Sequence, residues 1–434
     1  MKYFGTDGIR RKADFFTEEF LKRVCAAVAA IKSDAKVVIA RDPRPSGVII
    51  EKILSEGLAA AGIKVITVGM TATPVLAFCV RKYNADLGVM VSASHNPPEY
   101  NGIKFFDSEG RKITEELEEK IEEIIDGGYK PRRKKGGSVT PADGEGDYVR
   151  HFSALLKPRI SPKRVLLDTA NGATSFVAPR LFEALGCVAD VIFNDVGGEK
   201  INDGCGATAP EAFIEAAKKG KYDAGFCFDG DGDRVVAYCG GRVLDGDHMV
   251  YITAKYFLES GELSEKTIVG TIMSNRGVED AVLRSGLKFV RTSVGDKYVA
   301  YEMKRLQAEL GGEASGHVII ARYQNTGDGV LAGAVLLACD SAKGVNAYDD
   351  ITDYPQTSGD ILTTHEKVAE YKARQKEFAP MLEIIQRESG GRLVVRPSGT
   401  EPKIRIMAEA PTQAAAYLAV AKARLCILGG LGNV

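Results

Sequence analysis

The chain has 434 residues, more than one hydrophobic core supports, so roughly two to four domains are expected. Charged residues make up 26% and hydrophobic residues 45%, which is typical of a globular protein. The formal net charge of −1 argues against general nucleic-acid binding, because such binding needs a basic excess. The basic run 130–135 is interpreted as a solvated linker between domains, with a nucleic-acid patch as the alternative.

The eight cysteines are scattered and contain no C-x-x-C pair. This pattern indicates reduced cysteines in a reducing compartment rather than disulfides or a zinc site. No stretch reaches about 18 apolar residues, and the first residues contain no apolar signal segment. We therefore expect a cytoplasmic protein that has neither a membrane nor a nucleic acid as a partner.

Three successive segments share one order of elements: an apolar strand, a glycine-bearing turn, an amphipathic helix and further strands. The first has strands at 36–40, 64–68 and 87–91 and a helix at 47–61; the second has strands at 164–168, 188–193 and 224–228 and a helix at 175–185; the third has strands at 267–271, 288–291 and 316–320 and a helix at 277–285. Strands that alternate with helices predict largely parallel sheets covered on both faces.

The last part of the chain differs from these three segments. Strands at 360–364, 391–395 and 403–407 and helices at 366–378 and 412–426 predict a smaller α+β domain. The predicted domains are 1–140, 141–241, 242–350 and 351–434. Because ligands gather at the carboxyl ends of parallel strands, we expect the three sheets to direct these ends toward one central cleft.

The stretch CFDGDGDRVV places Asp229, Asp231 and Asp233 directly after a strand, with a glycine between each pair. Carboxylates this close repel one another, by roughly 4 kcal/mol per pair at about 4 Å, unless a cation lies among them. Oxygen ligands favour Mg²⁺ or Ca²⁺. An EF-hand loop is excluded because its sixth and twelfth positions would be Arg234 and Gly240. A metal site is predicted; an acidic turn in solvent is the alternative.

The strand 87–91 ends in the irregular loop SASHNP, and Lys104 follows shortly after it. Ser94 and His95 are adjacent, and adjacent side chains of an extended segment point apart, which argues against a serine-hydrolase dyad. The chain also lacks a G-x-S-x-G elbow. A phosphoryl group carried by Ser94, with a metal ion and Lys104 neutralising its charge, suits this loop better.

The stretch GGEASGHVII offers Glu313, Ser315 and His317 before an apolar strand. Polar side chains in such a glycine-rich loop can bind neighbouring sugar hydroxyls or an amine, although a structural histidine explains His317 equally well.

The stretch RPSGTEPKIRI brackets a turn with two arginines. Its hydroxyls, backbone N–H groups and guanidinium groups suit a phosphate, with a plain surface turn as the alternative. The residues concerned are Arg396, Ser398, Gly399, Thr400 and Arg405.

Together and in this order, the motifs resemble the α-D-phosphohexomutase family, most closely its branch of bacterial phosphoglucosamine mutases. The resemblance is carried by YFGTDGIR, SASHNP, DGDGDR, GEASGH and RPSGTEPKIRI, and for the glucosamine branch by DTANGA, INDGCGAT, VGDKYV and TGDG. It implies three α/β domains with mixed, largely parallel sheets and a C-terminal α+β domain of the TATA-box-binding-protein-like class, arranged around a central cleft.

The resemblance also implies the reaction. Glucosamine 6-phosphate and glucosamine 1-phosphate would interconvert through glucosamine 1,6-bisphosphate, which also serves as activator, on the route to UDP-N-acetylglucosamine. Ser94 would be the phosphorylated serine, and one of its phosphoryl oxygens would hold one Mg²⁺ together with Asp229, Asp231 and Asp233.

Other site residues follow from the same resemblance. Glu313 and Ser315 would read sugar hydroxyls. Positive charge near the phosphoserine would come from Arg10, Lys104 and Arg234, and His317 or Lys104 would transfer protons. The non-reacting phosphate would be held by Arg396, Ser398, Gly399, Thr400 and Arg405.

Three alternatives remain open. A phosphomannomutase or phosphoglucomutase of the same family has the same motifs, and Ala314, where the glucosamine branch usually has glutamine, bears on that choice. A metal-dependent phosphatase that uses a serine and a non-catalytic sugar-phosphate-binding protein are the other two. The sequence leaves the oligomeric state open, with a homodimer as one option.

Overall fold

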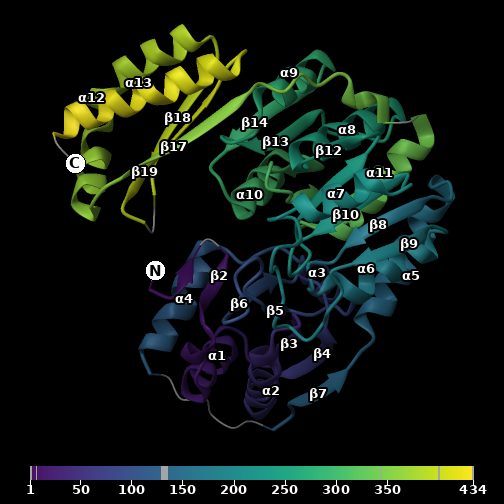
Figure 1. The fold of residues 1–434 in the computed structure, drawn as a ribbon. Helices are drawn as coiled ribbons and strands as arrows, with labels where there is room; N and C mark the ends of the chain where they lie inside the picture. The colour runs from purple at the N-terminus through teal and green to yellow at the C-terminus, as the bar shows by residue number, and fades with distance from the viewer. Residues whose placement is uncertain (1, 6, 129–134, 344, 399–400, 433–434) are drawn as a thin grey trace. The chain divides into compact units, whose positions relative to one another are not determined.

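The computed structural model describes residues 2–5, 7–128, 135–343, 345–398 and 401–432 of the chain. They divide into two compact units: Met1–Met273 with Ser285–Tyr348, and Ser274–Arg284 with Asp349–Val434. Figure 1 traces the chain from purple at the N-terminus to yellow at the C-terminus. Residues 130–134 of the predicted linker, and Gly399 and Thr400 of the predicted phosphate loop, lie outside the described residues.

The first unit begins with a seven-stranded sheet that mixes parallel and antiparallel strands. The spatial order is β1 (Phe4–Gly5), β2 (Gly8–Lys12), β6 (Tyr100–Asp107), β5 (Leu87–Val91), β3 (Lys36–Arg41), β4 (Lys64–Met70) and β7 (Ser138–Pro141). Strand β3 pairs in parallel with β4 and β5, whereas β6 is antiparallel to both of its neighbours. Strand β5 ends at Val91, as predicted, and so delivers the serine loop.

Helices cover both faces of this sheet (Figure 1). One face is covered by α1 (Glu18–Ile31), α2 (Pro45–Ala60) and α4 (Glu115–Asp126), which share a core with Val89. Gly88 points the other way along β5 and lies against Val80 and Leu76 of α3 (Thr73–Lys82), so α3 covers the opposite face. A short helix, η1 (Ala13–Phe15), follows β2.

The second sheet has five strands, in the order β12 (Arg242–Leu244), β11 (Val235–Cys239), β10 (Ala224–Phe228), β8 (Arg164–Asp168) and β9 (Val188–Ile192). Strand β8 is parallel to β9 and β10, and β11 is antiparallel to β10. The helices of this region are α5 (Gly144–Leu156), η2 (Lys157–Arg159), α6 (Thr174–Ala184) and α7 (Glu211–Lys219). Strands β8 and β10 have their predicted bounds, so the aspartate loop follows a buried strand.

The third sheet has four strands, in the order β14 (Lys288–Thr292), β13 (Thr267–Thr271), β15 (Leu310–Gly312) and β16 (Val318–Ile320). The strand predicted at 316–320 is shorter and runs antiparallel to β15. Strand β15 was not predicted, because two of its three residues are glycines and give no strand signal. The helices are α8 (Gly246–Glu259), α10 (Asp296–Leu306), α11 (Gly329–Lys343) and η3 (Val345–Tyr348).

The second unit contains a three-stranded antiparallel sheet, as the α+β prediction requires. Its strands lie in the order β17 (Gln356–Leu362), β19 (Lys403–Glu409) and β18 (Arg392–Pro397), and its helices are α9 (Arg276–Arg284), α12 (His365–Ser389) and α13 (Gln413–Leu431). Helix α12 continues through Pro380 and ends at Ser389, where Gly390 caps it with a φ of +67°, so the predicted end at 378 is wrong. The predicted fold class is confirmed, whereas the four domain boundaries stay predictions.

Helix α13 is long and apolar enough, by length and composition, to cross a membrane. In this structure 33% of its most apolar window is buried. The buried residues include Ala419, Ala423 and Ile427, which share a core with Ile404 and Ile406 of β19. Helix α13 therefore has a packing role in the C-terminal core.

A buried carboxylate connects α5 to the start of α11. Asp328 accepts hydrogen bonds from Tyr148 Oη at 2.8 and 2.9 Å and from the Leu331 N–H at 2.9 Å. Burial raises the pKa of Asp328 from 3.8 to about 6. Asp328 therefore holds its proton more tightly in the folded protein than in the unfolded chain. The stability that this provides is present near pH 4 and is lost as the pH rises through 6, where the folded protein must bury a charged carboxylate.

The Asp328→Asn variant is therefore expected to gain stability relative to wild type as the pH rises from about 4 to about 7, by up to roughly 3 kcal/mol. The amide carries no charge, so it escapes the cost of burying a carboxylate. Urea denaturation of both proteins at the two pH values measures the difference. A difference that does not change with pH would contradict the raised pKa.

Candidate active site

Ser94 lies at the end of β5 and is held by its backbone. Its carbonyl accepts hydrogen bonds from Arg44 Nη2 at 2.9 Å and Asn202 Nδ2 at 3.0 Å, and its N–H donates to Ser92 Oγ at 2.9 Å. Arg44 is fully buried and pairs with Asp42 at 2.9 Å. Ser94 has a φ of +52°, a left-handed conformation that is uncommon outside glycine and that these contacts maintain.

The expectation that the side chains of Ser94 and His95 point apart is wrong, because this loop is not extended. With Ser94 in the left-handed region, its Oγ lies 3.5 Å from His95 Nδ1. Burial and the nearby Arg234 and Arg10 lower the pKa of His95 to about 4, so the imidazole is neutral. A neutral ring at this distance is a weak partner for Ser94, and the closer partner of its hydroxyl is a carboxylate.

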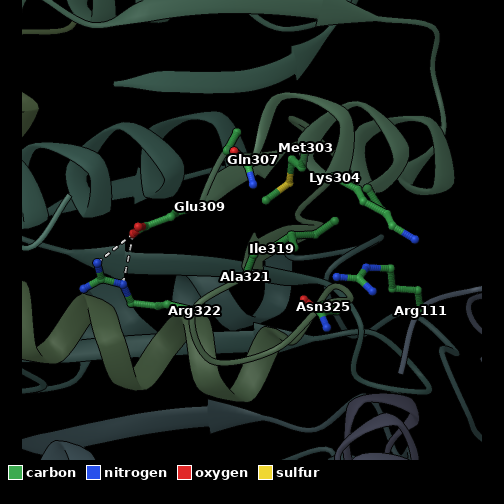
Figure 2. A pocket seen from close by; sticks show the side chains of 11 residues that line it. Arg111, Met303, Lys304, Gln307, Glu309, Ile319, Ala321, Arg322 and Asn325 are labelled. Carbon is green, nitrogen blue, oxygen red and sulfur yellow. Dashed lines mark hydrogen bonds and ion pairs between the residues drawn. The ribbon is translucent and has the colours of Figure 1, made fainter. Parts of the chain in front are cut away.

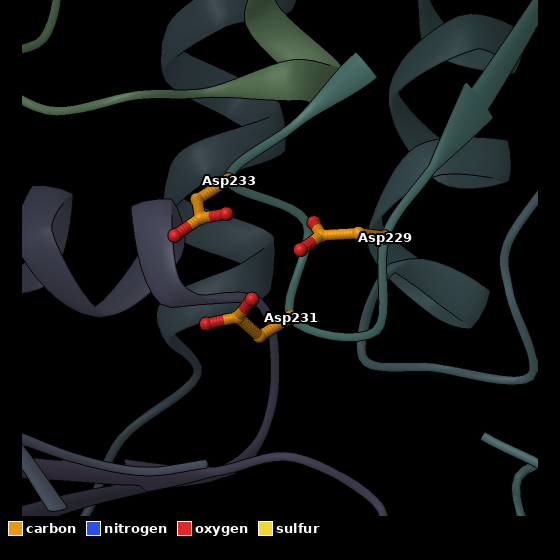
Figure 3. A group of neighbouring side chains, drawn as sticks. All are labelled: Asp229, Asp231 and Asp233. Atoms are coloured by element: carbon orange, nitrogen blue, oxygen red, sulfur yellow. The ribbon is translucent and has the colours of Figure 1, made fainter. Parts of the chain in front are cut away.

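That carboxylate belongs to the aspartate loop. Ser94 Oγ donates to Asp229 Oδ2 at 2.9 Å, and all three aspartates are almost completely buried. One oxygen from each of Asp229, Asp231 and Asp233 lies within 4.8 Å of the others, and Figure 3 shows the three groups turned toward one another. Gly232 permits this curl with a φ of +76°.

The donor atoms of the three aspartates fit a divalent cation. Asp231 Oδ1 is buried and has no hydrogen-bond partner among the described residues, and Asp233 Oδ1 has only His317 Nε2 nearby, at 3.2 Å. Burial and the neighbouring Asp233 and Asp231 raise the pKa of Asp229 to about 7. Buried carboxylate oxygens that repel one another are the ligands that Mg²⁺ selects, so these residues could hold this ion.

Six largely buried side chains of alternating charge form a closed ring beside the aspartates, which we call the charge ring. In order they are Asp7, Lys104, Asp233, His317, Asp296 and Lys112. Lys104 Nζ lies 2.9 Å from Asp7 and 3.5 Å from Asp233, and also 2.6 Å from Asp231. His317 Nε2 lies 3.2 Å from Asp233 and 3.9 Å from Asp296. Lys112 pairs with Asp296 at 2.5 Å and with Asp7, which closes the ring.

The members of the charge ring stabilise one another's ionised forms. Burial lowers the pKa of Lys104, but Asp231 and Asp7 outweigh it and raise the pKa. Burial opposes the charge of Asp233, yet His317 and Lys104 hold the pKa of that carboxyl well below its usual range. Burial also lowers the pKa of His317, but the charges of Asp233 and Asp296 outweigh this effect, so the pKa of His317 is raised. The charge ring thus links residues from all three sheet regions of the first unit.

Three members of the charge ring were not identified as site residues from the sequence. Asp7 and Asp296 do lie in the motifs YFGTDGIR and VGDKYV, so those motifs held a signal. Lys112 follows a strand and a turn with no recognisable pattern, and only its contacts with the two carboxylates reveal it.

The structure brings most of the predicted catalytic and sugar-binding residues to this place. Arg10 donates to Asp7 and to Asn96 Oδ1. The buried Arg234 Nε has no hydrogen-bond partner among the described residues. Glu313 Oε1 accepts from the Gly295 N–H at 2.9 Å, and Glu313 Oε2 lies 3.5 Å from His317 Nδ1. Ser315 is exposed at the turn that follows.

The predicted phosphate loop lies in the second unit. Arg396 and Arg405 are opposite each other on β18 and β19. Burial and the charge of Arg405 lower the pKa of Arg396. Ser398 Oγ accepts from the Glu401 N–H at 3.2 Å, and Arg405 pairs with Glu401 at 2.7 Å. Two arginines at paired positions of neighbouring strands suit an anion.

Family models match nearly the whole chain. The four domains of the phosphoglucomutase/phosphomannomutase models match in order: α/β/α domain I at residues 1–132, α/β/α domain II at 146–241, α/β/α domain III at 245–357 and the C-terminal domain at 361–423.

Two curated relatives that match almost the whole chain share a name. A phosphoglucosamine mutase of Lactobacillus helveticus is 41% identical over 435 residues, with 95% of each chain covered. The enzyme of that name from Thermotoga neapolitana is 42% identical over 417 residues, with 94% of this chain and 95% of that protein covered.

Solved structures share the fold over the full length. A phosphoglucomutase/phosphomannomutase family protein from Burkholderia thailandensis has a TM-score of 0.80 at 24% identity and covers 98% of this chain and 97% of its own. An N-acetylphosphoglucosamine mutase from Aspergillus fumigatus, in complex with GlcNAc-6P and magnesium, has a TM-score of 0.69 at 17% identity, covering 99% and 96%. With identities near 40% over almost all of its length, this chain belongs to the phosphoglucomutase/phosphomannomutase family.

Proposed function

We propose that the protein interconverts glucosamine 6-phosphate and glucosamine 1-phosphate through glucosamine 1,6-bisphosphate, with Ser94 as the phosphoryl carrier. The observation that carries this proposal is the buried hydrogen bond of 2.9 Å from Ser94 Oγ to Asp229, within a group of three aspartates. A hydroxyl in that position can exchange a phosphoryl group next to a cation. The amino sugar is proposed because relatives at about 40% identity are phosphoglucosamine mutases.

In this proposal one Mg²⁺ is held by Asp229, Asp231, Asp233 and an oxygen of phosphorylated Ser94, and supplies positive charge at the transferring group. The chain provides further positive charge around the same point. Arg234 Nε is a buried donor without a partner among the described residues, and Arg10 lies in contact with the serine loop through Asn96. Both guanidinium groups are positioned to bind phosphoryl oxygens.

Proton transfer is assigned to His317. The alternative group, Lys104, is held as a cation by Asp231 and Asp7, so it keeps its proton near neutral pH and acts as a fixed charge. His317 is held between Asp233 and Glu313, the residue proposed to read the sugar hydroxyls together with Ser315. This position allows a proton to pass between the imidazole and the hydroxyl that receives the phosphoryl group.

The remaining proposals concern the second phosphate of the substrate, the cellular location and the partners of the protein. Arg396, Ser398 and Arg405, with Gly399 and Thr400 outside the described residues, are proposed to hold the phosphate that does not react. The bisphosphate would reorient between the two transfer steps and would activate unphosphorylated enzyme. A cytoplasmic location, a homodimer and the absence of nucleic-acid and membrane partners stay predictions.

A comparison of substrates tests the proposed function. With Mg²⁺ and bisphosphate present, kcat/KM for glucosamine 1-phosphate is expected to exceed that for glucose 1-phosphate and for mannose 1-phosphate by at least about tenfold, since one well-placed polar contact on the amine accounts for such a ratio. Faster turnover of either hexose phosphate would reassign the protein to phosphoglucomutase or phosphomannomutase activity. Stoichiometric release of inorganic phosphate would indicate a phosphatase instead.

A further inference from the structure

A cavity of about 400 Å³ lies in the first unit, and its lining does not include a member of the charge ring (Figure 2). The carboxylates around its rim outnumber the cations: Asp107, Glu109, Glu262 and Glu309 against Arg111, Lys304 and Arg322. The charges of this rim therefore satisfy one another. The aspartate loop differs, because Asp231 Oδ1 is buried there without a hydrogen-bond partner among the described residues.

A buried threonine holds this aspartate from behind. Thr73 is the first residue of α3 and is completely buried. Its hydroxyl donates to Asp231 Oδ2 at 2.5 Å, and its N–H donates to the Asp231 carbonyl at 2.8 Å. The shorter distance is typical of a hydrogen bond from a hydroxyl to an ionised carboxylate. Thr73 thus fixes both the backbone and the side chain of one residue of the aspartate loop.

The two oxygens of Asp231 differ in their surroundings. Oδ2 accepts from Thr73 and also from Lys104 Nζ at 2.6 Å, whereas Oδ1 has no partner among the described residues. Lys104 Nζ also lies near Asp7 and Asp233, so it does not by itself fix the orientation of the Asp231 carboxylate. The hydroxyl of Thr73 therefore decides which oxygen of Asp231 is occupied and which one is left for a cation.

A carboxylate with one oxygen occupied gives only the other oxygen to a metal ion. Mg²⁺ is small and demands near-ideal octahedral geometry, whereas the larger Ca²⁺ accepts carboxylates bound through one or both oxygens and takes more ligands. Asp229 is restricted in a similar way, because its Oδ1 accepts from the Gly232 and Arg234 N–H groups, both at 3.1 Å. The hydrogen bonds behind these carboxylates thus favour the smaller ion.

We propose that Thr73 is a positioning residue that sets the preference of the aspartate loop for Mg²⁺ over Ca²⁺. It acts through Asp231, whose Oδ1 it leaves for the ion. This inference rests on the metal site of the proposed function, but it does not depend on the identity of the sugar. Hydrogen-bonding groups behind metal ligands contribute a factor of about 10–100 to metal affinity. Without the hydroxyl, the Asp231 carboxylate can rotate, so Mg²⁺ should lose more affinity than Ca²⁺.

Calorimetric titration of the chelator-treated, full-length protein with MgCl₂ and with CaCl₂ tests this role. Thr73→Val removes the hydroxyl and keeps the shape of the side chain, and Thr73→Ala also avoids a methyl group against the carboxylate. Both are expected to raise the Kd for Mg²⁺ by about tenfold or more and the Kd for Ca²⁺ by less. The ratio of the Ca²⁺ constant to the Mg²⁺ constant should therefore fall. Thr73→Ser, which keeps the hydroxyl, should retain the wild-type ratio.

Thr174→Val is the matched control. Thr174 is likewise completely buried at the first residue of a helix, α6, and it lies beside the aspartate loop, since a Cβ atom at Gly232 would be 2.4 Å from its methyl carbon. Its hydroxyl donates to the Thr169 carbonyl at 3.5 Å rather than to a carboxylate. This variant should therefore leave both dissociation constants unchanged.

Two results would overturn the role of Thr73 and leave the proposed function intact, as long as wild type binds Mg²⁺. One is an equal loss of affinity for both ions in the Thr73 variants, which would mean that Thr73 only supports the fold. The other is wild-type affinity for both ions in Thr73→Val and Thr73→Ala. A wild-type protein that binds neither ion would contradict the metal site itself, and with it both proposals.

Discussion

Replacement of Ser94 by alanine is expected to lower kcat by at least about 10⁴-fold, because the variant lacks the hydroxyl that is proposed to carry the phosphoryl group. Intact-mass spectrometry should find one added phosphoryl group on a fraction of wild-type molecules and none on the Ser94→Ala variant. The variant should still fold, since the backbone contacts of residue 94 with Arg44 and Asn202 do not involve the hydroxyl. The left-handed conformation of residue 94 costs alanine about as much as it costs serine, so it adds no further destabilisation.

Ser92→Ala is the matched control for this experiment. It removes the hydroxyl that accepts the Ser94 N–H and that donates to Asp42 at 2.6 Å, but it leaves the proposed phosphoryl carrier in place. We expect this variant to be less stable and slower than wild type and yet to retain the phosphoryl mass. Turnover by Ser94→Ala close to the wild-type rate, or a phosphoryl mass on that variant, would rule out Ser94 as the carrier.

The fold could largely be predicted because the strands that carry the site are short apolar runs with turns at their ends. Strands β5, β8, β10 and β13 have the predicted bounds, and each is buried along nearly its whole length, so hydrophobicity alone identifies it. Strand β15 is as important for the site, since Glu313 follows it, but its sequence Leu-Gly-Gly carries no such signal. Only its pairing with β13 and β16 makes it a strand.

The candidate site was predictable where one loop carries several ligands, and not where distant residues meet. The three aspartates alternate with glycines in five positions, so their convergence follows from local geometry. Lys112 meets Asp7 and Asp296, which are separated from it by about a hundred and about two hundred residues, and no local pattern encodes such an encounter. The left-handed conformation of Ser94 also depends on distant partners, Arg44 and Asn202.

The Asp229→Asn variant is expected to change stability in opposite directions with and without magnesium. In wild-type protein treated with a chelator, three buried carboxylates repel one another, and the burial cost appears as the raised pKa of Asp229. Because this pKa is raised to about 7, the stability due to the protonated form is lost above that pH. At about pH 8 the metal-free variant should therefore be more stable than metal-free wild type, by roughly 2 kcal/mol. Asparagine can keep the hydrogen bonds that Asp229 Oδ1 accepts from the Gly232 and Arg234 N–H groups.

Addition of Mg²⁺ should reverse this order. A ligand that binds only the folded protein stabilises it by about 2.7 kcal/mol at a hundred times its Kd, so wild type should gain that amount and the variant almost none. Turnover of the variant should fall at least about 100-fold, since even groups that only orient metal ligands contribute up to that factor. Thermal denaturation with chelator and with Mg²⁺ measures the reversal.

Asp328→Asn, which neutralises another buried carboxylate of the same unit, should retain the full gain from Mg²⁺. Equal stabilisation of wild type and Asp229→Asn by Mg²⁺ would show that the ion binds elsewhere. An ion that Asp229 ligates must bind more weakly when the negative charge of this carboxylate is removed.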